Sequence, residues 1–506
     1  MKPRAHLFAA ALLLAAALPG ADPPKPAPSA ATEALPPELK ALIDNDTAEI
    51  LRRDSNLGPN EVPDLRLRQD TNYAHTSVDY EPYGAIKPYK EHFLKQMEYT
   101  GPGRTIPEPG PDLKTVKIGF IGPIMSTVSV ATGGKSHEEV LGIKMLEGAK
   151  LAMEDWNARG GYLRRHIPFE LDVRNDNGLW GASGNEIIKM AYSNEDWALL
   201  GTIDGANSHI AIRVALKAEI VMMNTGDTDP TFIETNIPWV MRCIGDDRQM
   251  GYLLMDYVLQ KMNYKRIAII RSSNRYGRFG VRKIVDAARR HQRPILIEMA
   301  YRVGSEDFSL QLQRIKEVNP DVVIHWGDAH ESALVLNQMR KMGMNQPYMA
   351  SDRSASPEFV KLAGANAEGV VCGYPWNPDR KNPKLDAFRV AFRKRFNDDP
   401  NTYAAHAYDG MNLLIWATQV AGLNRAKIRD VLAYRTKPWP GVTGDIPFSA
   451  ALDDLGEVFL AKYESGGWHY LSRDDLNLPR GYIPLRDRVN RATGAIDPMK
   501  TPAPAE

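Results

Sequence analysis

Cysteine is scarce in this chain: the 506 residues include only Cys243 and Cys372. This scarcity excludes the disulfide framework that holds many small secreted domains together. In an oxidising compartment the two cysteines can form one bridge. Two buried free thiols are the slightly favoured alternative, because a disulfide requires Cα atoms within about 7 Å of each other.

An excess of charge of either sign is also missing. Lys and Arg total 63 against 62 Asp and Glu, which leaves a formal net charge of +1. A nucleic-acid partner is not expected, because proteins that bind nucleic acid normally carry a basic surplus. Acidic tails and polybasic patches for membrane surfaces are absent as well. The chain is too long for one core and suits two or three domains, and its 43% hydrophobic content permits large ones.

A long apolar run occurs only at the start of the chain. Lys2 and Arg4 precede an apolar stretch at 7–18, and Pro19-Gly20-Ala21 follows it, which is the layout of a secretory signal peptide. The stretch is too short for a permanent membrane span, which needs about 20 residues. No cysteine follows it, so a lipid anchor is excluded there. We expect residues 1–21 to be a signal peptide and the mature protein to be soluble in the periplasm or extracytoplasmic space.

The next segment, residues 22–113, lacks regular periodicity and is rich in proline. We expect a linker followed by an N-terminal arm. The arm's several tyrosines can provide a docking surface for a partner. An extended arm wrapped over the main body is the favoured alternative, because isolated tyrosines usually pack their rings and expose their hydroxyls. Residues 481–506 are expected to be a C-terminal tail.

Between 116 and 466, buried-strand patterns alternate with amphipathic-helix patterns, and glycine-bearing polar loops follow the strands. Val116–Gly122 opens one such series and Arg266–Ile270 opens a second. Such alternation builds parallel sheets, which bind ligands at the carboxyl ends of their strands. We therefore predict an α/β protein with two Rossmann-like lobes and a cleft between them. Residues 457–471 predict a terminal β-hairpin.

Motifs for catalysis or metal binding are weak. No Gly-x-Ser-x-Gly or His-Glu-x-x-His pattern occurs, and Gly133–Ser136 lacks the first glycine of a phosphate-binding loop because Ser129 stands there. The segment 325–331 holds two histidines and two acids, which are ligand types for a transition metal. A polar loop at the edge of a cleft is the favoured interpretation. We predict no catalytic residue, no metal and no cofactor.

Two loops at strand ends are candidates for ligand binding. In 201–208 a strand runs into a helix start, where free amides near Ala206 and Asn207 favour an anion such as a ligand carboxylate. Ser208 can instead cap its own helix, and both roles can hold at once. In 224–230 the chain offers carbonyl, hydroxyl and carboxylate oxygens to a ligand ammonium, through Gly226, Asp227 and Thr228. A solvated acidic turn is about equally favoured for each residue of that loop.

Several short segments, in order and spacing, give residues 114–472 a resemblance to a known family. They are Lys117-Ile118-Gly119 with Gly122-Pro123, Gly148-Ala149-Lys150-Leu151-Ala152 leading to Asn157 and Gly160-Gly161, Arg242 followed by Asp246-Asp247-Arg248-Gln249, Arg266-Ile267-Ala268 to Tyr276-Gly277, Asp307-Phe308-Ser309, Asn319-Pro320-Asp321, and Gly466-Gly467-Trp468. The chain resembles the type I periplasmic binding proteins of ABC importers, of the leucine/isoleucine/valine-binding kind. The resemblance implies two lobes joined by a multi-strand hinge. We expect lobe 1 to comprise 114–245 and 377–456, and lobe 2 to comprise 246–376 and 457–480.

The resemblance also assigns roles to individual residues. It implies that the turn 206–208 holds a ligand carboxylate and that Gly226 and Thr228 contact the ligand through a carbonyl and a hydroxyl. Tyr276 matches an aromatic contact from the second lobe, Asp328 a polar or aromatic contact, and Asp352 the acid that pairs with the α-ammonium group. The acids Asp204, Asp227, Asp229 and Asp328 depart from the usual pattern. If two or more of them face the cleft, they favour a ligand with extra positive charge or several hydroxyls.

The expected function is therefore capture of a small solute, an amino acid or a related amine with a carboxylate, by a monomer that delivers it to an ABC permease in the inner membrane. A ligand-sensing module of the same fold, signalling to a partner protein, is the alternative; neighbouring permease genes or neighbouring kinase genes distinguish the two. An enzyme built around His325, Asp328 and His330 is the least favoured, and stoichiometric metal or turnover of a solute would support it.

Overall fold

The computed structural model describes residues 98–110, 112–126, 138–176, 180–234, 237–291, 293, 295–435, 437–449, 451–479 and 481. The expected signal peptide, most of the N-terminal arm and nearly all of the expected C-terminal tail lie outside the described residues. The rejected phosphate-loop motif at 133–136 lies outside them as well.

The first sheet contains five strands, and every neighbouring pair is parallel. Its order is β2-β1-β3-β4-β5, formed by β1 (Val116–Gly122), β2 (Phe169–Asn175), β3 (Ala198–Gly201), β4 (Val221–Asn224) and β5 (Val240–Arg242). β3, β4 and β5 are buried along their whole length, as expected for strands covered on both faces. We call this sheet and the helices packed on it the first lobe.

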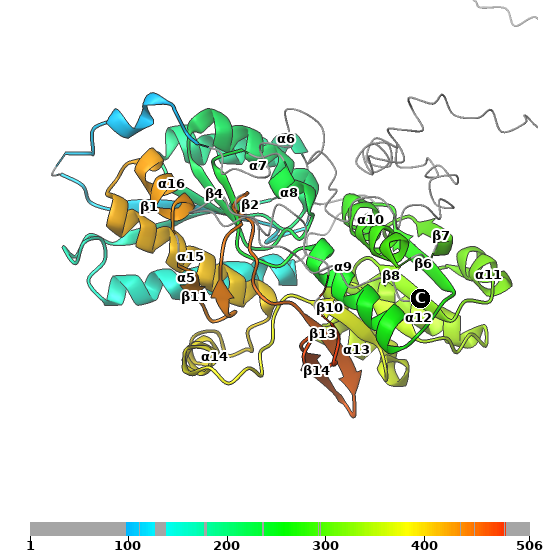
Figure 1. The fold of residues 1–506 in the computed structure, drawn as a ribbon. Helices are drawn as coiled ribbons and strands as arrows, with labels where there is room; N and C mark the ends of the chain where they lie inside the picture. Colours follow the sequence, from blue (N-terminus) through cyan, green and yellow to red (C-terminus); the bar gives the residue numbers. More distant parts are fainter. Residues whose placement is uncertain are drawn as a thin grey trace, which may run out of the picture.

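Helices cover both faces of the first sheet (Figure 1). They are α5 (Val140–Ala158), α6 (Trp180–Ile188) with the π-helical turn η4 (Lys189–Ser193), α7 (Gly205–Ala218), α8 (Thr231–Glu234), α15 (Thr402–Ala421) and α16 (Arg425–Ala433). The helix α14 (Pro383–Phe396) packs on α5, and the 3-10 turn η2 (Pro102–Thr105) lies against α16. α5 and α15 approach so closely that a Cβ atom at Gly148 would stand 2.0 Å from the Ala404 carbonyl oxygen. Only glycine fits there. Gly160 and Gly161, both with positive φ, follow the end of α5.

The second sheet contains seven strands in the order β14-β13-β10-β9-β8-β6-β7. They are β6 (Ile267–Ser272), β7 (Ile295–Tyr301), β8 (Val322–Trp326), β9 (Tyr348–Ala350), β10 (Val371–Tyr374), β13 (Phe459–Glu464) and β14 (Gly467–Leu471). The strands from β6 to β10 pair in parallel. β13 and β14 form an antiparallel hairpin at the edge next to β10, which confirms the predicted hairpin.

Two hydrophobic clusters sandwich the second sheet. In β6, Ile267 and Ile269 point to one cluster while Ala268 and Ile270 point to the other, since strand side chains alternate between faces. The helices α9 (Asp247–Asp256), which ends in the π-helical turn η5 (Tyr257–Lys261), and α10 (Arg275–Arg290) cover one face. The other face carries α11 (Ser309–Glu317), α12 (Ala329–Lys341), α13 (Pro357–Ala363) and the 3-10 turns η6 (Asp352–Ser354) and η7 (Gly364–Ala367).

The chain passes between the two sheets at three places, after β5, after β10 and before β13. The third passage follows a small pair of strands, β11 (Trp439–Pro440) and β12 (Asp445–Ile446). The predicted α/β class with two parallel-sheet lobes joined at several strands is confirmed. The residue bounds expected for each lobe remain a prediction.

The two cysteines lie beside two of these passages, and both are buried free thiols. Cys243 directly follows β5, and Cys372 lies within β10. Burial raises the pKa of each thiol well above its usual value. The bridge that the sequence left open is not formed.

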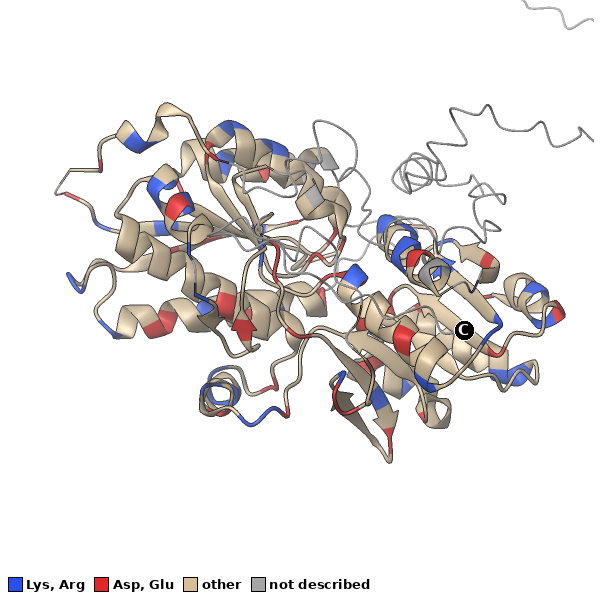
Figure 2. Ribbon diagram, viewed as in Figure 1, with Lys and Arg blue, Asp and Glu red and all other residues tan. Residues whose placement is uncertain are grey.

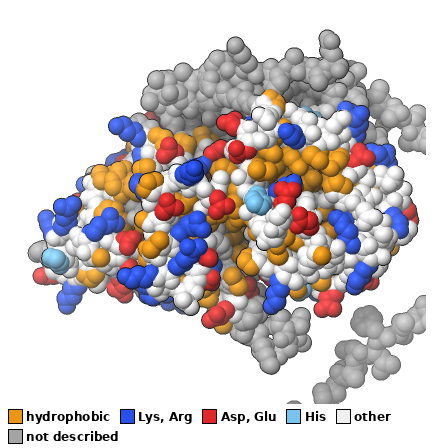
Figure 3. Space-filling view, turned by 90° about the horizontal axis from the view of Figure 1, so that it is seen from below, with side chains coloured by type: hydrophobic (Ala, Val, Ile, Leu, Met, Phe, Trp, Pro, Cys, Tyr) orange, Lys and Arg blue, Asp and Glu red, His pale blue; other side chains and the backbone are white. Residues whose placement is uncertain are grey.

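Acidic and basic side chains are interspersed over both lobes (Figure 2). The face turned toward the reader in Figure 3 likewise mixes the two signs among hydrophobic patches. Acidic and basic side chains, which are nearly equal in number in the sequence, are thus also mixed with one another on this surface.

Candidate functional site

The nine predicted site residues follow the carboxyl ends of strands in the two sheets, where the lobes meet. Ala206, Asn207 and Ser208 begin α7 after β3, and Gly226, Asp227 and Thr228 follow β4. Tyr276 in α10 follows β6, Asp328 follows β8, and Asp352 follows β9. This is the edge at which open parallel sheets bind ligands.

The loop after β3 uses its own acid to cap α7. The Asp204 side chain accepts a hydrogen bond from the Ala206 amide (N–Oδ1 2.7 Å), so the amide that the sequence offered to a ligand carboxylate is already engaged. Ser208 donates to the Asp204 carbonyl oxygen at 3.0 Å and also contacts the Thr202 hydroxyl. Asn207 donates from Nδ2 to Asp176 Oδ1 at 2.6 Å.

Short-range hydrogen bonds fix the loop after β4. Asn224 Oδ1 accepts from the amides of Gly226 and Asp227 at 3.0 and 2.8 Å. Asp227 Oδ1 accepts from the Asp229 amide at 2.9 Å. A Cβ atom at Gly226 would lie 2.7 Å from Ile203, so the two loops of the first lobe are in close contact. This half of the site is shaped before any ligand arrives.

Asp227 and Asp229 are both buried but have opposite pKa shifts. Burial and the charge of Asp229 raise the pKa of Asp227 to about 7. Asp229 is buried too, yet the positive charge of Arg275 and hydrogen bonds from Thr231 hold its pKa below the usual value. Asp227 Oδ2 has no hydrogen-bond partner among the described residues.

Arg275, at the start of α10, crosses from the second lobe to the first. Its Nε lies 2.6 Å from Asp229 Oδ2, and its Nη2 lies 2.6 Å from Thr231 Oγ1 and 3.0 Å from His209 Nε2. Burial lowers the pKa of His209 to about 4, so a neutral imidazole accepts from the guanidinium. The structure therefore shows the lobes in contact. The sequence analysis missed this residue, although it directly precedes Tyr276.

On the second-lobe side, Asp352 is the centre of a hydrogen-bonded group. The Tyr276 hydroxyl donates to Asp352, and so does the hydroxyl of Tyr403, which belongs to α15 of the first lobe, at 3.4 Å. The Arg353 guanidinium lies over the Tyr276 ring at 3.8 Å and donates to Asp328 Oδ1 at 2.7 Å. Burial raises the pKa of Asp352, although Arg353 and the Tyr276 hydrogen bond oppose it. The structure thus brings Tyr276, Asp328 and Asp352 together.

Asp247 is a candidate site residue to which the sequence analysis gave no role beyond its place in the family resemblance. It begins α9 directly after the first passage between the sheets, and its amide donates to the Thr228 carbonyl oxygen at 2.9 Å. Burial and the negative charge of Asp352 raise its pKa well above the usual value, while the side chain of Thr228 lowers it. Neither carboxylate oxygen meets a partner at hydrogen-bond geometry within the described chain. Its position shortly after the carboxyl end of a strand was the feature of the sequence that could have indicated a role in ligand binding.

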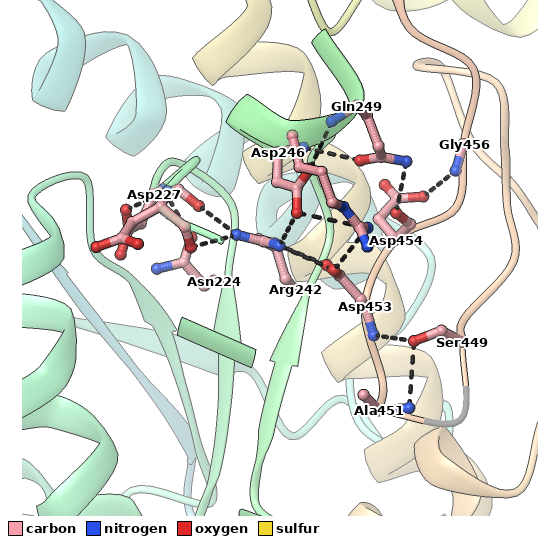
Figure 4. A network of polar contacts seen from close by, with 12 residues as sticks. Asn224, Asp227, Arg242, Asp246, Gln249, Ser449, Ala451, Asp453, Asp454 and Gly456 are labelled. Atoms are coloured by element: carbon pink, nitrogen blue, oxygen red, sulfur yellow. Dashed lines mark hydrogen bonds and ion pairs between the residues drawn. The ribbon is translucent and has the colours of Figure 1, made fainter. Parts of the chain in front are cut away.

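Behind these loops, a fully buried arginine connects three segments (Figure 4). Arg242 donates to Asp453 through Nε (2.7 Å) and Nη2 (2.9 Å), to Asp246 Oδ2 at 2.9 Å, and to the Asp229 carbonyl oxygen at 2.7 Å. Asp246 also forms a capping box with Gln249 at the start of α9. The network fixes the loop after β4 relative to α9 and to the segment near the third passage.

The segment with two histidines does not form a cluster. His325 lies within β8, where its Nε2 contacts the Tyr301 hydroxyl at 2.8 Å and its ring stacks between Tyr301 and Tyr348. Burial lowers its pKa to about 3. His330 lies 3.7 Å from Glu358 at the surface. Across the part of the chain that the structure describes, no three metal-ligating side chains are grouped to hold an ion.

The structure has two parallel-sheet lobes that three connections join. The lobes meet at the carboxyl ends of their strands, where polar side chains are buried. This architecture defines a two-lobed solute-binding protein. A family model described as "Periplasmic binding protein" matches residues 115–455. The chain belongs to that family and is a type I periplasmic binding protein of the leucine/isoleucine/valine-binding kind.

Among its relatives, the Leu/Ile/Val-binding protein homolog 2 of Brucella abortus is 24% identical over 371 residues, which cover 68% of this chain and 96% of the relative. The leucine-specific-binding protein of Salmonella typhimurium is 25% identical over 313 residues, covering 60% and 84%. Both names describe proteins that bind amino acids, and this supports a solute-binding role for the chain.

Solved structures show the same fold. The branched-chain amino acid transporter substrate-binding protein of Streptococcus pneumoniae, in complex with isoleucine, has a TM-score of 0.62 at 23% identity and covers 71% of this chain and 99% of its own. A solute-binding protein of R. palustris in complex with benzoate has a TM-score of 0.61 at 15% identity, covering 73% and 97%. One fold thus accommodates chemically different solutes. Among the described residues, no helix combines the length and apolarity that a bilayer span requires.

Proposed function

We propose that this chain is an extracytoplasmic solute-binding protein of an ABC transporter, which binds an amino acid or a related amine or carboxylate between its lobes and delivers it to a membrane permease. The carrying observation is the group around Asp352, where Tyr276 of the second lobe and Tyr403 of the first both donate to one buried carboxylate. Side chains from both lobes thus converge at the carboxyl end of a parallel strand, where open parallel sheets bind ligands. The names of the relatives support amino-acid binding, and the name of the Streptococcus pneumoniae protein supports the transport role.

The mechanism requires no covalent step. A solute first binds the loops of the first lobe, which are already fixed by their own hydrogen bonds. Contacts from Arg275, Tyr276 and Asp352 exist only when the lobes approach, so the solute shifts the population toward the closed form. We propose that a permease recognises the closed form, and that the protein acts without catalysis as an exported monomer.

Calorimetry on the purified chain, stripped of any co-purified solute and titrated with the amino acids and their amine analogues, tests this proposal. We expect one solute class to bind at one site per chain and to reduce the radius of gyration in X-ray scattering. Deletion of the gene should abolish uptake of that solute. Saturable binding with unchanged uptake would instead favour a sensing module, and conversion of the solute to a product would favour an enzyme.

A further inference from the structure

The junction between the lobes has a surplus of buried hydrogen-bond acceptors. Both carboxylate oxygens of Asp247, Oδ2 of Asp227 and Oδ1 of Asn207 have no partner among the described residues. These three side chains are 0 to 2% exposed. Buried polar atoms are normally paired, so unpaired ones at a ligand-binding edge indicate groups that a ligand completes.

Several backbone donors of the same loops are engaged by the loops themselves. The amides of Ala206, Gly226, Asp227 and Asp229 each donate to a side-chain oxygen of a neighbouring residue. The Thr231 amide and hydroxyl both donate to Asp229 Oδ1, at 2.9 and 2.8 Å. A ligand carboxylate would therefore meet few free donors on the first lobe.

The balance of charge points the same way. The second lobe contributes the cations Arg275 and Arg353, and each already forms an ion pair, with Asp229 at 2.6 Å and with Asp328 at 2.7 Å. Arg242, behind the loop after β4, is paired with Asp246 and Asp453. Arg353 Nε is a fully buried guanidinium nitrogen that lacks an acceptor within the described residues. Asp227, Asp247 and Asp352 are buried acids that no described cation pairs within 4 Å.

We infer that the solute is a small organic amine with a protonated nitrogen and no carboxylate, and that Asp247 and Asp227 contact it together with Asp352. This inference rests on the proposed function and narrows its solute class. A protonated amine supplies donors to the unpaired oxygens of Asp247 and Asp227 and positive charge to the group of acids, and burial without such a partner is costly for a carboxylate. A ligand carboxylate at the same place would oppose ionisation of the three acids, whereas a protonated amine favours their charged form.

The inference is tested with pairs of probes that differ only in the carboxylate: cadaverine and lysine, agmatine and arginine, isoamylamine and leucine. In calorimetry on the whole stripped chain, we expect the amine of at least one pair to bind at least tenfold more tightly than its parent amino acid. The inference is wrong, while the receptor function stands, if the amino acid binds at least as tightly as its amine in every pair for which binding is detected. If neither class binds, both are wrong.

A substitution locates the contact. Asp247→Asn should weaken binding of the best amine at least tenfold. The matched control is Asp196→Asn, because Asp196 is also 0% exposed with two unpartnered oxygens but precedes β3 at the amino end of the first sheet, opposite the junction. If both variants bind like the parent protein, Asp247 is not a contact. If Asp247→Asn does not give a cooperative thermal transition, Asp227→Asn replaces it with the same expectation.

Discussion

The two lobes contribute to their junction in different ways. The first lobe offers loops held by hydrogen bonds between residues two to four positions apart, such as Asp204 with Ala206 and Asn224 with Asp227. The second lobe offers long side chains, Arg275, Tyr276 and Arg353, that reach outward from helix starts. The first lobe is therefore a pre-shaped half, and the second lobe is a half whose side chains extend toward it. This difference indicates that solute binding and lobe closure depend on different residues. Each can therefore be disturbed without the other.

The largest expected effect removes the support of the pre-shaped half. Arg242→Ala leaves Asp246 and Asp453 buried without their cation, which should lower the free energy of unfolding by about 3–5 kcal/mol. Urea denaturation measures it. The control is Arg104→Ala, which breaks a partly exposed ion pair with Asp430 and should cost at most about 1 kcal/mol. Equal losses in the two variants would contradict the role of the buried network.

The next effect is a loss of solute affinity caused by a substitution in the second lobe, with the fold left intact. Asp352→Ala should weaken binding of the tightest probe among the three amines and three amino acids at least tenfold, about 1.4 kcal/mol, because the central acceptor of Tyr276 and Tyr403 is lost. Calorimetry reports it. Asp328→Ala, which removes only the partner of Arg353, should have a smaller effect. An unchanged dissociation constant for Asp352→Ala would remove this acid from the site.

A smaller effect separates closure from binding. Arg275→Gln breaks the ion pair between the lobes, so the protein without solute should open and its radius of gyration should rise, while the free energy of unfolding changes by about 1 kcal/mol or less. X-ray scattering and thermal unfolding measure the two quantities. Arg271→Gln breaks a comparable pair, with Glu298, inside the second lobe and should leave the radius unchanged. A radius equally unchanged in Arg275→Gln would show that this contact does not hold the lobes together.

The smallest effect is a dependence of binding on pH. The pKa of Asp227 is raised to about 7, so this carboxyl group is largely neutral at pH 6 and charged at pH 7.5. A cationic amine prefers the charged form, so its affinity should fall by up to about tenfold as the pH is lowered over this range. Calorimetry with cadaverine at both pH values measures the change. Asp227→Asn should flatten the dependence; an equally steep profile in that variant would assign the proton to another group.

The fold was largely predictable, because strands covered on both faces leave apolar runs such as Ile267–Ile270 that a sequence displays directly. The edge that gathers polar loops was predictable for the same reason. Which donors remain free was not: the engagement of the Ala206 amide depends on how the Asp204 side chain turns. Arg275 and Asp247 were missed since their surroundings come from the meeting of two lobes, which no local pattern records.

The buried arginine behind the site has a mechanical consequence. Arg242 ends β5 just before the first passage between the sheets, and its partner Asp453 lies shortly before the third. Two of the three connections are therefore clamped into a single pivot. We therefore expect the halves of this molecule to swing about that pivot and not to slide past one another, so that each opening follows the same path.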